Sequence, residues 1–169
     1  MTPQMPIPSE PPCGGPDPGL LPVDLRLRFP ATAPAVRAAL EEITGGLRGR
    51  ICAPTLGMLE IVLAEVLNNI VEHAYRGGGA GAIGLSVAAD PQMLSCEVRD
   101  YGTPLPALLP TTEGGGASIF GPDGALKEGG WGWHIIGRLT RDLSYRRQGG
   151  ENRLCFALDL CPTPHCRAE

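Results

Sequence analysis

The sequence predicts a two-layer α/β (α+β) sandwich, in which helices cover one face of a mixed, largely antiparallel β-sheet. Five short segments carry the apolar patterns of strands, and three longer segments carry those of helices. In chain order they read β-α-α-β-β-α-β-β, with a long glycine-rich loop before the third helix. This order favours helices gathered on one face of a sheet. With 169 residues, the chain is long enough for one domain with a hydrophobic core.

The first three elements are one strand and two helices. Residues 23–29 alternate apolar and polar side chains with a period of two, as a half-buried strand does. Residues 32–34 provide a threonine cap and an early-turn proline for a helix that runs to about Leu47. The second helix covers about residues 55–75. One apolar stripe lies along it: Leu59, Leu63, Val66, Leu67, Ile70 and Ala74.

The later elements are two strands, a helix and a closing hairpin. Asp90–Pro91 is typical of the turn between the two strands, and Gly149–Gly150 of the turn in the hairpin. The glycine-rich residues 129–132 precede the helix. The expected ranges are 83–87 and 94–99 for the strands, up to Leu139 for the helix, and 143–147 and 153–158 for the hairpin.

Three segments differ from these elements in composition. Residues 1–22 hold eight prolines and few bulky apolar side chains, which predicts a disordered leader. Residues 161–169 form a short tail, so we expect the folded domain to span about residues 23–160. Within it, residues 103–129 combine many glycines and prolines with few bulky residues. A loop this long inside a compact domain is usually a functional lid.

Composition argues against several classes of protein. The net charge of -4 gives no overall attraction to nucleic acid or to an anionic membrane. We expect no membrane span, because no apolar run approaches about 18 residues. We also expect no secretory signal, because no basic segment precedes an apolar one at the N-terminus. The six cysteines lack the paired short spacing of a zinc site, and several should serve as small core hydrophobes. The expected location is the cytoplasm.

A carboxylate and an amide stand one turn apart on the second helix. At about 100° and 1.5 Å per residue, Glu65 and Asn69 lie about 40° and 6 Å apart on one face. Mg²⁺ prefers oxygen ligands, so an amide oxygen together with substrate phosphates can hold it. A nearby carboxylate can accept a proton from an attacking hydroxyl or water. Taken alone, the pair is more typical of a solvated helix face, so residues further along the chain decide its meaning.

Two further patterns suit a nucleotide. Asp100 ends a strand, where its carboxylate can accept a hydrogen bond from an exocyclic amine such as that of adenine, and Gly102 leaves room for a flat base. Gly130 and Gly132 open a helix, where backbone N–H groups and the helix dipole favour phosphate. Lys127, the one lysine in the chain, can add a positive charge there. Each pattern alone is also an ordinary turn or helix start.

In this order, the patterns resemble the N, G1 and G2 boxes of the GHKL ATPase and kinase superfamily. Residues 63–75 are most similar to the N box of the anti-sigma-factor serine kinases of the RsbW and SpoIIAB type. The resemblance covers about residues 23–160 and implies the Bergerat ATP-binding fold. It implies ATP and Mg²⁺ as ligands, with Glu65 as the catalytic base and Asn69 as the Mg²⁺ ligand. It further implies that Asp100 reads adenine, Gly102 lines the base pocket, and Gly130 and Gly132 contact the phosphates.

The chain departs from the family pattern in three places. After the G1 box, where a second glycine often follows, this chain has residues 103–106, Thr-Pro-Leu-Pro. Many members have a threonine that helps to bind adenine before the last strand, whereas this chain has residues 151–153, Glu-Asn-Arg. We therefore expect adenine to be bound more weakly or in a different arrangement. Trp131 and Trp133 replace smaller aliphatic residues. We expect them to pack in the core, with an aromatic surface for a partner as the alternative. His73, frequent in the N box, should pack or form a hydrogen bond.

The resemblance implies a serine-protein kinase of a bacterial partner-switching system. Its substrate would be a small antagonist similar to anti-anti-sigma factors, and it would sequester a sigma factor or another regulator, with dimerisation implied by the family. A nucleic-acid or membrane partner is not expected. The alternatives are a nucleotide-controlled anti-sigma binding module without kinase turnover, and a scaffold domain that binds no nucleotide.

Overall fold

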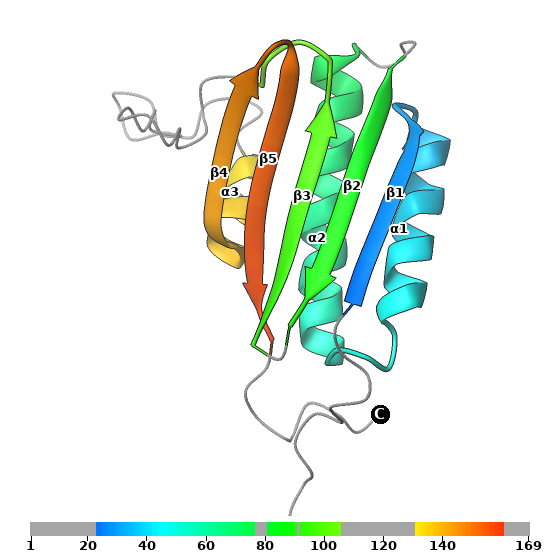
Figure 1. Ribbon diagram of the computed structural model, residues 1–169, viewed down its shortest axis with the longest axis vertical. Helices are drawn as coiled ribbons and strands as arrows, with labels where there is room; N and C mark the ends of the chain where they lie inside the picture. The colour runs from blue at the N-terminus through cyan, green and yellow to red at the C-terminus, as the bar shows by residue number, and fades with distance from the viewer. Residues whose placement is uncertain (1–22, 77–80, 91, 106–130, 161–169) are drawn as a thin grey trace, which may run out of the picture.

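The computed structural model describes residues 23–76, 81–90, 92–105 and 131–160. Five strands form one sheet in the order β1-β2-β3-β5-β4, with helices behind it (Figure 1). The elements are β1 (Val23–Pro30), α1 (Ala33–Leu47), α2 (Ala53–Asn69), η1 (Ile70–Ala74), β2 (Ala82–Ala89), β3 (Met93–Asp100), α3 (Trp131–Leu139), β4 (Arg141–Gln148) and β5 (Glu151–Asp159). The expected two-layer sandwich is confirmed.

Each neighbouring pair of described strands is antiparallel. The sheet is therefore antiparallel throughout, rather than mixed with a parallel component. For two of the four pairs the reason lies in the connections. Short turns join β2 to β3 and β4 to β5, and such turns can join only antiparallel strands. In the sheet, β5 lies between β3 and β4. Because β5 runs antiparallel to β3, its start lies beside the end of β3.

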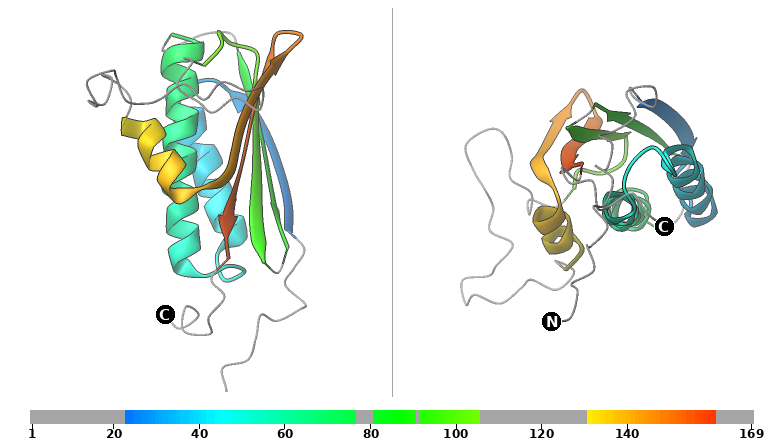
Figure 2. Two further views of the ribbon diagram at one scale, coloured as in Figure 1. Left: turned by 90° about the vertical axis from the view of Figure 1, so that its left-hand side faces the viewer. Right: turned by 90° about the horizontal axis from the view of Figure 1, so that it is seen from below.

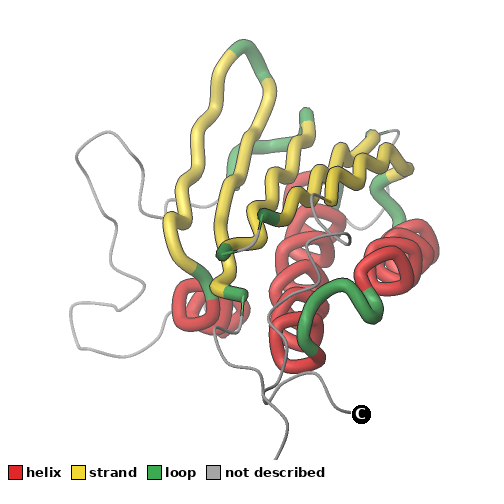
Figure 3. The backbone as a smooth tube through the Cα atoms, turned by 60° about the horizontal axis from the view of Figure 1, so that its bottom comes forward, coloured by secondary structure: helices red, strands yellow, loops and turns green. Residues whose placement is uncertain are grey.

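The helices all lie on one side of the sheet, and its other face carries no described helix (Figures 2 and 3). Alternate strand side chains point toward the helices and are buried, as the period of two requires. The helix α2 contributes side chains that are almost completely removed from water: Leu59, Val62, Leu63, Val66 and Leu67. The core therefore forms between α2 and the middle strands, as the stripe along this helix predicts.

The second helix differs from its sequence expectation at its end. One α-helix was expected to reach Tyr75, but α2 ends at Asn69 and continues as the π-helical turn η1. The Tyr75 N–H donates to the Ile70 carbonyl at 3.1 Å, the five-residue spacing of a π-turn. A single widened turn does not disturb an apolar pattern enough to be read from sequence. Such turns occur frequently at functional sites.

The segment Ala53–Ala74 is long and apolar enough to cross a membrane by length and composition alone. The sequence expectation of no such run overlooked this stretch, because Glu60, Glu65 and Glu72 interrupt it. In the structure its apolar side faces the sheet. A core helix passes the same test of length and composition, so this segment is the central helix of the sandwich.

The burial of α2 leads to a prediction about stability. Replacing Leu63, which is completely buried, by alanine should lower the free energy of unfolding by about 2–5 kcal/mol, because it removes apolar contacts and leaves a cavity. The matched control is Ile61→Ala, two residues away, since Ile61 is 50% exposed and should change stability by less than about 1 kcal/mol. Urea unfolding followed by circular dichroism measures both. Equal losses would contradict the placement of α2.

Candidate functional site

The first turn of α3 lies against the polar face of α2. A Cβ atom added to Gly132 would come within 2.5 Å of Glu65 Oε2 and 3.4 Å of Asn69 Nδ2. Figure 2 shows α3 beside the central helix on the same side of the sheet. The glycine-rich helix start and the carboxylate-amide pair, more than sixty residues apart in the sequence, are therefore neighbours. Glu65 and Asn69, which looked solvated from sequence alone, are half-buried.

The side-chain amide of Asn69 has a polar atom without a hydrogen-bond partner in the described part of the chain. Its Nδ2 atom is buried and has no hydrogen-bond partner among the described residues. A buried donor without a partner costs about 1–3 kcal/mol, so native proteins rarely leave one. A phosphate oxygen would accept the hydrogen bond that the amide nitrogen has to donate. The amide oxygen is a ligand that Mg²⁺ accepts. With the carboxylate of Glu65 beside it, this donor set fits a magnesium-phosphate group.

Two of the expected phosphate-site residues cannot be placed. Lys127 and Gly130 lie outside the described residues, as does most of the expected lid at 103–129. Among the described residues no group of three or more histidine, cysteine or acidic side chains is arranged to hold a metal ion. A metal at Asn69 would thus depend on oxygens from its substrate and from water, as Mg²⁺ bound to phosphates usually does.

The second part of the site forms where the loop after β3 meets the end of η1. A Cβ on Gly102 would come within 2.6 Å of Ala74 Cβ and 2.7 Å of the Ala74 carbonyl oxygen, so this position has room only for glycine. The Thr103 N–H donates to the Ala74 carbonyl at 3.0 Å, and its hydroxyl donates to the His73 carbonyl at 3.0 Å. The loop thereby satisfies carbonyls that the end of a helix leaves without partners.

Asp100 is the buried carboxylate of this loop, with only 2% of its surface exposed. Its Oδ1 atom accepts a hydrogen bond from the Gly102 N–H at 2.8 Å and one from Asn152 Nδ2 at 2.9 Å. Burial raises the pKa of Asp100 above its usual value, while these two hydrogen bonds and the positive charge of Arg147 oppose the rise. The structure therefore holds one buried carboxylate beside the glycine that was expected to line a base pocket.

Sequence reasoning treated Asn152 only as a departure from the family, yet it is central to this loop. Its side chain is 1% exposed and contacts Asp100 from the neighbouring strand β5. Its Oδ1 atom accepts hydrogen bonds from the Tyr145 hydroxyl and from Arg147. The feature that could have identified Asn152 is the pairing of β3 with β5, because its register sets Asp100 opposite Asn152. That register depends on strand order, which sequence patterns do not reveal.

The helix α2 connects the two parts of the site. Asn69 and Ala74 are five residues apart, and the chain runs directly from the carboxylate-amide pair to the contact with Gly102. A base beside Asp100 and phosphates beside Asn69 would both lie against this one helix. The side chain of His73 is exposed rather than packed in the core, and its backbone carbonyl accepts the hydrogen bond from Thr103. Trp133 is buried in the core as expected, and the side chain of Trp131 is outside what the structure describes.

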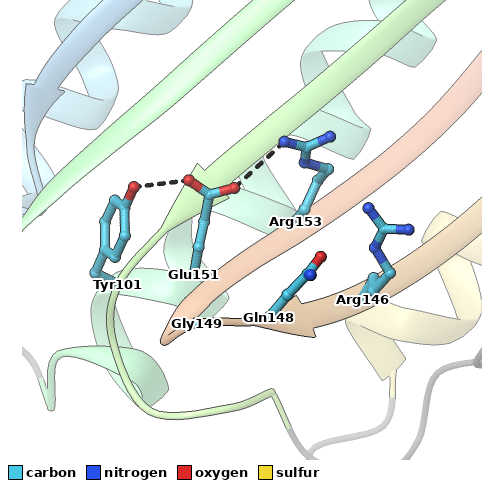
Figure 4. A pocket seen from close by; sticks show the side chains of 6 residues that line it. All are labelled: Tyr101, Arg146, Gln148, Gly149, Glu151 and Arg153. Carbon is cyan, nitrogen blue, oxygen red and sulfur yellow. Dashed lines mark hydrogen bonds and ion pairs between the residues drawn. The ribbon is translucent and has the colours of Figure 1, made fainter.

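A separate pocket of about 250 Å³ lies on the opposite face of the hairpin (Figure 4). Alternation along β5 explains the separation, because Asn152 points into the sandwich while Glu151 and Arg153 point away. The Tyr101 hydroxyl donates to Glu151 Oε2 at 2.7 Å, and Arg153 pairs with the other oxygen at 3.4 Å. These charged groups largely satisfy one another, so this pocket is a weaker candidate than the face that holds Asp100.

Comparison with known proteins supports the nucleotide interpretation. A family model described as a histidine kinase-like ATPase domain matches residues 29–158, which include all the described site residues. The serine/threonine-protein kinase BtrW of Bordetella bronchiseptica is 32% identical over 119 residues, a match that covers 69% of this chain and 79% of BtrW.

A solved structure shows the same fold. The crystal structure of the RsbU and RsbW domains of Rv1364c from Mycobacterium tuberculosis superposes with a TM-score of 0.57 and 16% identity. The match covers 82% of this chain but only 32% of that longer chain. At this identity the similarity concerns the fold alone. The extent of the family match, together with the identity to BtrW, shows that the chain belongs to the histidine kinase-like ATPase domain family.

Proposed function

We propose that this protein is an ATP- and Mg²⁺-dependent serine-protein kinase of a partner-switching system. The observation that carries the proposal is the close approach of Gly132 to Glu65 and Asn69, which brings a general base, an amide suited to Mg²⁺ and a helix start together. The identity to BtrW, whose name describes a serine/threonine-protein kinase, supports this activity over ATP binding alone. The proposed substrate is a small antagonist protein resembling anti-anti-sigma factors.

In the proposed reaction the nucleotide lies along α2. Asp100 accepts a hydrogen bond from the exocyclic amine of adenine, and Gly102 lets the loop beside this base site pack closely on Ala74. Asn69 would hold Mg²⁺ through its amide oxygen, and the bound ion would neutralise phosphate charge. The backbone at Gly132 approaches the phosphates at the N-terminal end of α3. Each group lies on the side of the sheet that the helices cover.

Glu65 performs the proton transfer. Its carboxylate accepts the proton of the substrate serine while the serine oxygen bonds to the γ-phosphorus. The bond between the γ-phosphorus and the β,γ-bridging oxygen breaks, and ADP leaves. The product is a phosphoserine with a charge of about -1.5 to -2, which weakens docking of the antagonist. The kinase surface is then free to bind a sigma factor or another regulator.

The first test concerns the base. Glu65→Gln should lower phosphoryl transfer by about 10²–10⁴-fold, because glutamine cannot accept the serine proton. ATP binding should remain, since the substitution preserves the shape of the side chain. Transfer of radiolabelled phosphate to a small antagonist of the anti-anti-sigma type measures the reaction. Glu60→Gln, an exposed change on the same helix, is the control. ATP binding without transfer by the wild type would instead favour a nucleotide-controlled binding module.

The second test concerns the close approach of α3. Gly132→Ala should lower transfer by about a hundredfold, because the new methyl group would displace Glu65 or the helix start. Gly137→Ala is the matched control in the same helix, since a Cβ there meets nothing within 4 Å. The control should keep full activity and gain about 0.5–1 kcal/mol of stability. Similar transfer rates in the two variants would show that α3 does not approach Glu65.

The third test uses pH. The ionised Asp100 accepts the amine hydrogen bond, so ATP affinity should be full above its pKa in the free protein and fall as the pH drops through that value. Because burial raises this pKa, the loss should begin at a higher pH than for an exposed aspartate. Calorimetric titration with ATP and with tripolyphosphate, which lacks the base, separates this effect from phosphate protonation. Parallel pH curves for the two ligands would exclude Asp100.

A further inference from the structure

We propose that Asn152 is a positioning residue that sets the selectivity of this site for adenine by orienting Asp100. The inference rests on the proposed function and extends it to a residue outside the three motifs. Asn152 does not touch the nucleotide in this proposal. It acts through the carboxylate of Asp100, whose Oδ1 atom lies 2.9 Å from Asn152 Nδ2.

All the hydrogen-bond donors and acceptors of the Asn152 side chain already have partners in the protein. Its Nδ2 atom faces three oxygens: Asp100 Oδ1 at 2.9 Å, the Thr103 carbonyl at 3.2 Å and the Gly102 carbonyl at 3.4 Å. An amide nitrogen has two hydrogens to donate, so these acceptors use both. Its Oδ1 atom accepts from the Tyr145 hydroxyl at 2.8 Å and from Arg147. With both donors and both acceptor positions in use, Asn152 has no free polar atom to offer a nucleotide.

These partners also determine which way the amide points. A flipped amide would turn its oxygen toward the Asp100 carboxylate and two carbonyls, and its nitrogen toward a guanidinium. Acceptors would then face acceptors and donors would face donors, which buried groups do not tolerate. The orientation of Asn152 is therefore set by Arg147 and the Gly102–Thr103 loop. Arg147 reinforces it by donating to the Gly102 carbonyl at 2.9 Å.

As a consequence, the two carboxylate oxygens of Asp100 differ in their hydrogen bonding. Oδ1 already accepts from the Gly102 N–H and from Asn152, whereas Oδ2 accepts no hydrogen bond from the described residues. A carboxylate held at one oxygen cannot rotate freely, so the other oxygen presents an acceptor in one direction. Adenine offers an exocyclic amine donor to that acceptor. Guanine and hypoxanthine offer a carbonyl oxygen at the same ring position, which a fixed carboxylate oxygen repels.

The role of Asn152 also accounts for the missing threonine. The side chain at the start of β5 reaches the base-reading carboxylate from the opposing strand, because Asp100 and Asn152 are paired in the register. An asparagine there bridges the carboxylate and two carbonyls of the following loop at once, which one hydroxyl cannot do. In this proposal, the different arrangement for adenine expected from the sequence is an asparagine that holds Asp100 and the Gly102–Thr103 loop together.

The experiment compares two nucleotides that differ only in their base with a ligand that lacks the nucleoside. Calorimetric affinities of the full-length protein are measured for ATP, ITP and tripolyphosphate in the presence of Mg²⁺. Asn152→Ala should weaken ATP about ten- to a hundredfold, as expected for loss of a hydrogen bond to a charged group. It should leave tripolyphosphate unchanged and reduce the preference for ATP over ITP. A merely structural role would lower the unfolding temperature without changing this preference.

Two adjacent arginines provide matched variants that are expected to fold. Arg147 donates to Asn152, whereas Arg146 points to the opposite face of the hairpin (Figure 4). Arg147→Ala should weaken ATP by about three- to tenfold with tripolyphosphate unchanged, and Arg146→Ala should change neither. Wild-type ATP affinity in Asn152→Ala, or equal effects of the two arginine variants, would overturn this inference alone. Absence of ATP binding by the wild-type protein would overturn the proposed function as well.

Discussion

The burial of one face of α2 is the constraint on which the rest of the structure depends. Its stripe of leucines and valines packs on the sheet, so the helix cannot rotate about its axis without exposing them to water. Because the stripe fixes that rotation, Glu65 and Asn69 must point away from the strands, toward α3. The hydrophobic core thus determines the direction in which the two polar side chains point.

One strand of the closing hairpin, β5, contributes side chains to both faces of the sheet. Successive residues of β5 point to opposite faces, so Asn152 enters the sandwich while Glu151 and Arg153 join Tyr101 in the outer pocket. The same alternation separates Arg147 from Arg146 on β4. Since β5 is inserted between β3 and β4, the hairpin delivers its buried polar side chains directly behind the loop that follows β3.

Much of the architecture could be predicted from local patterns. Strand and helix periodicities placed every described strand and α-helix, because apolar spacing follows burial on one face. The π-turn η1 was not foreseen, since one widened turn leaves that spacing almost unchanged. The antiparallel pairing of β3 with β5 was not foreseen either, as no local pattern records which strands are neighbours. The contact between Asp100 and Asn152, 52 residues apart, depends entirely on that pairing.

The sequence by itself determined the fold class and the identity of the motif residues, because the elements form through periodicity and the motifs through short spacing. Only the tertiary structure decided that Gly132 touches Glu65, that Asn69 has a buried nitrogen without a described partner, and that Asn152 holds Asp100. These relations join segments far apart in the chain. Strand order and helix packing create them, and both are properties of the whole chain rather than of any segment.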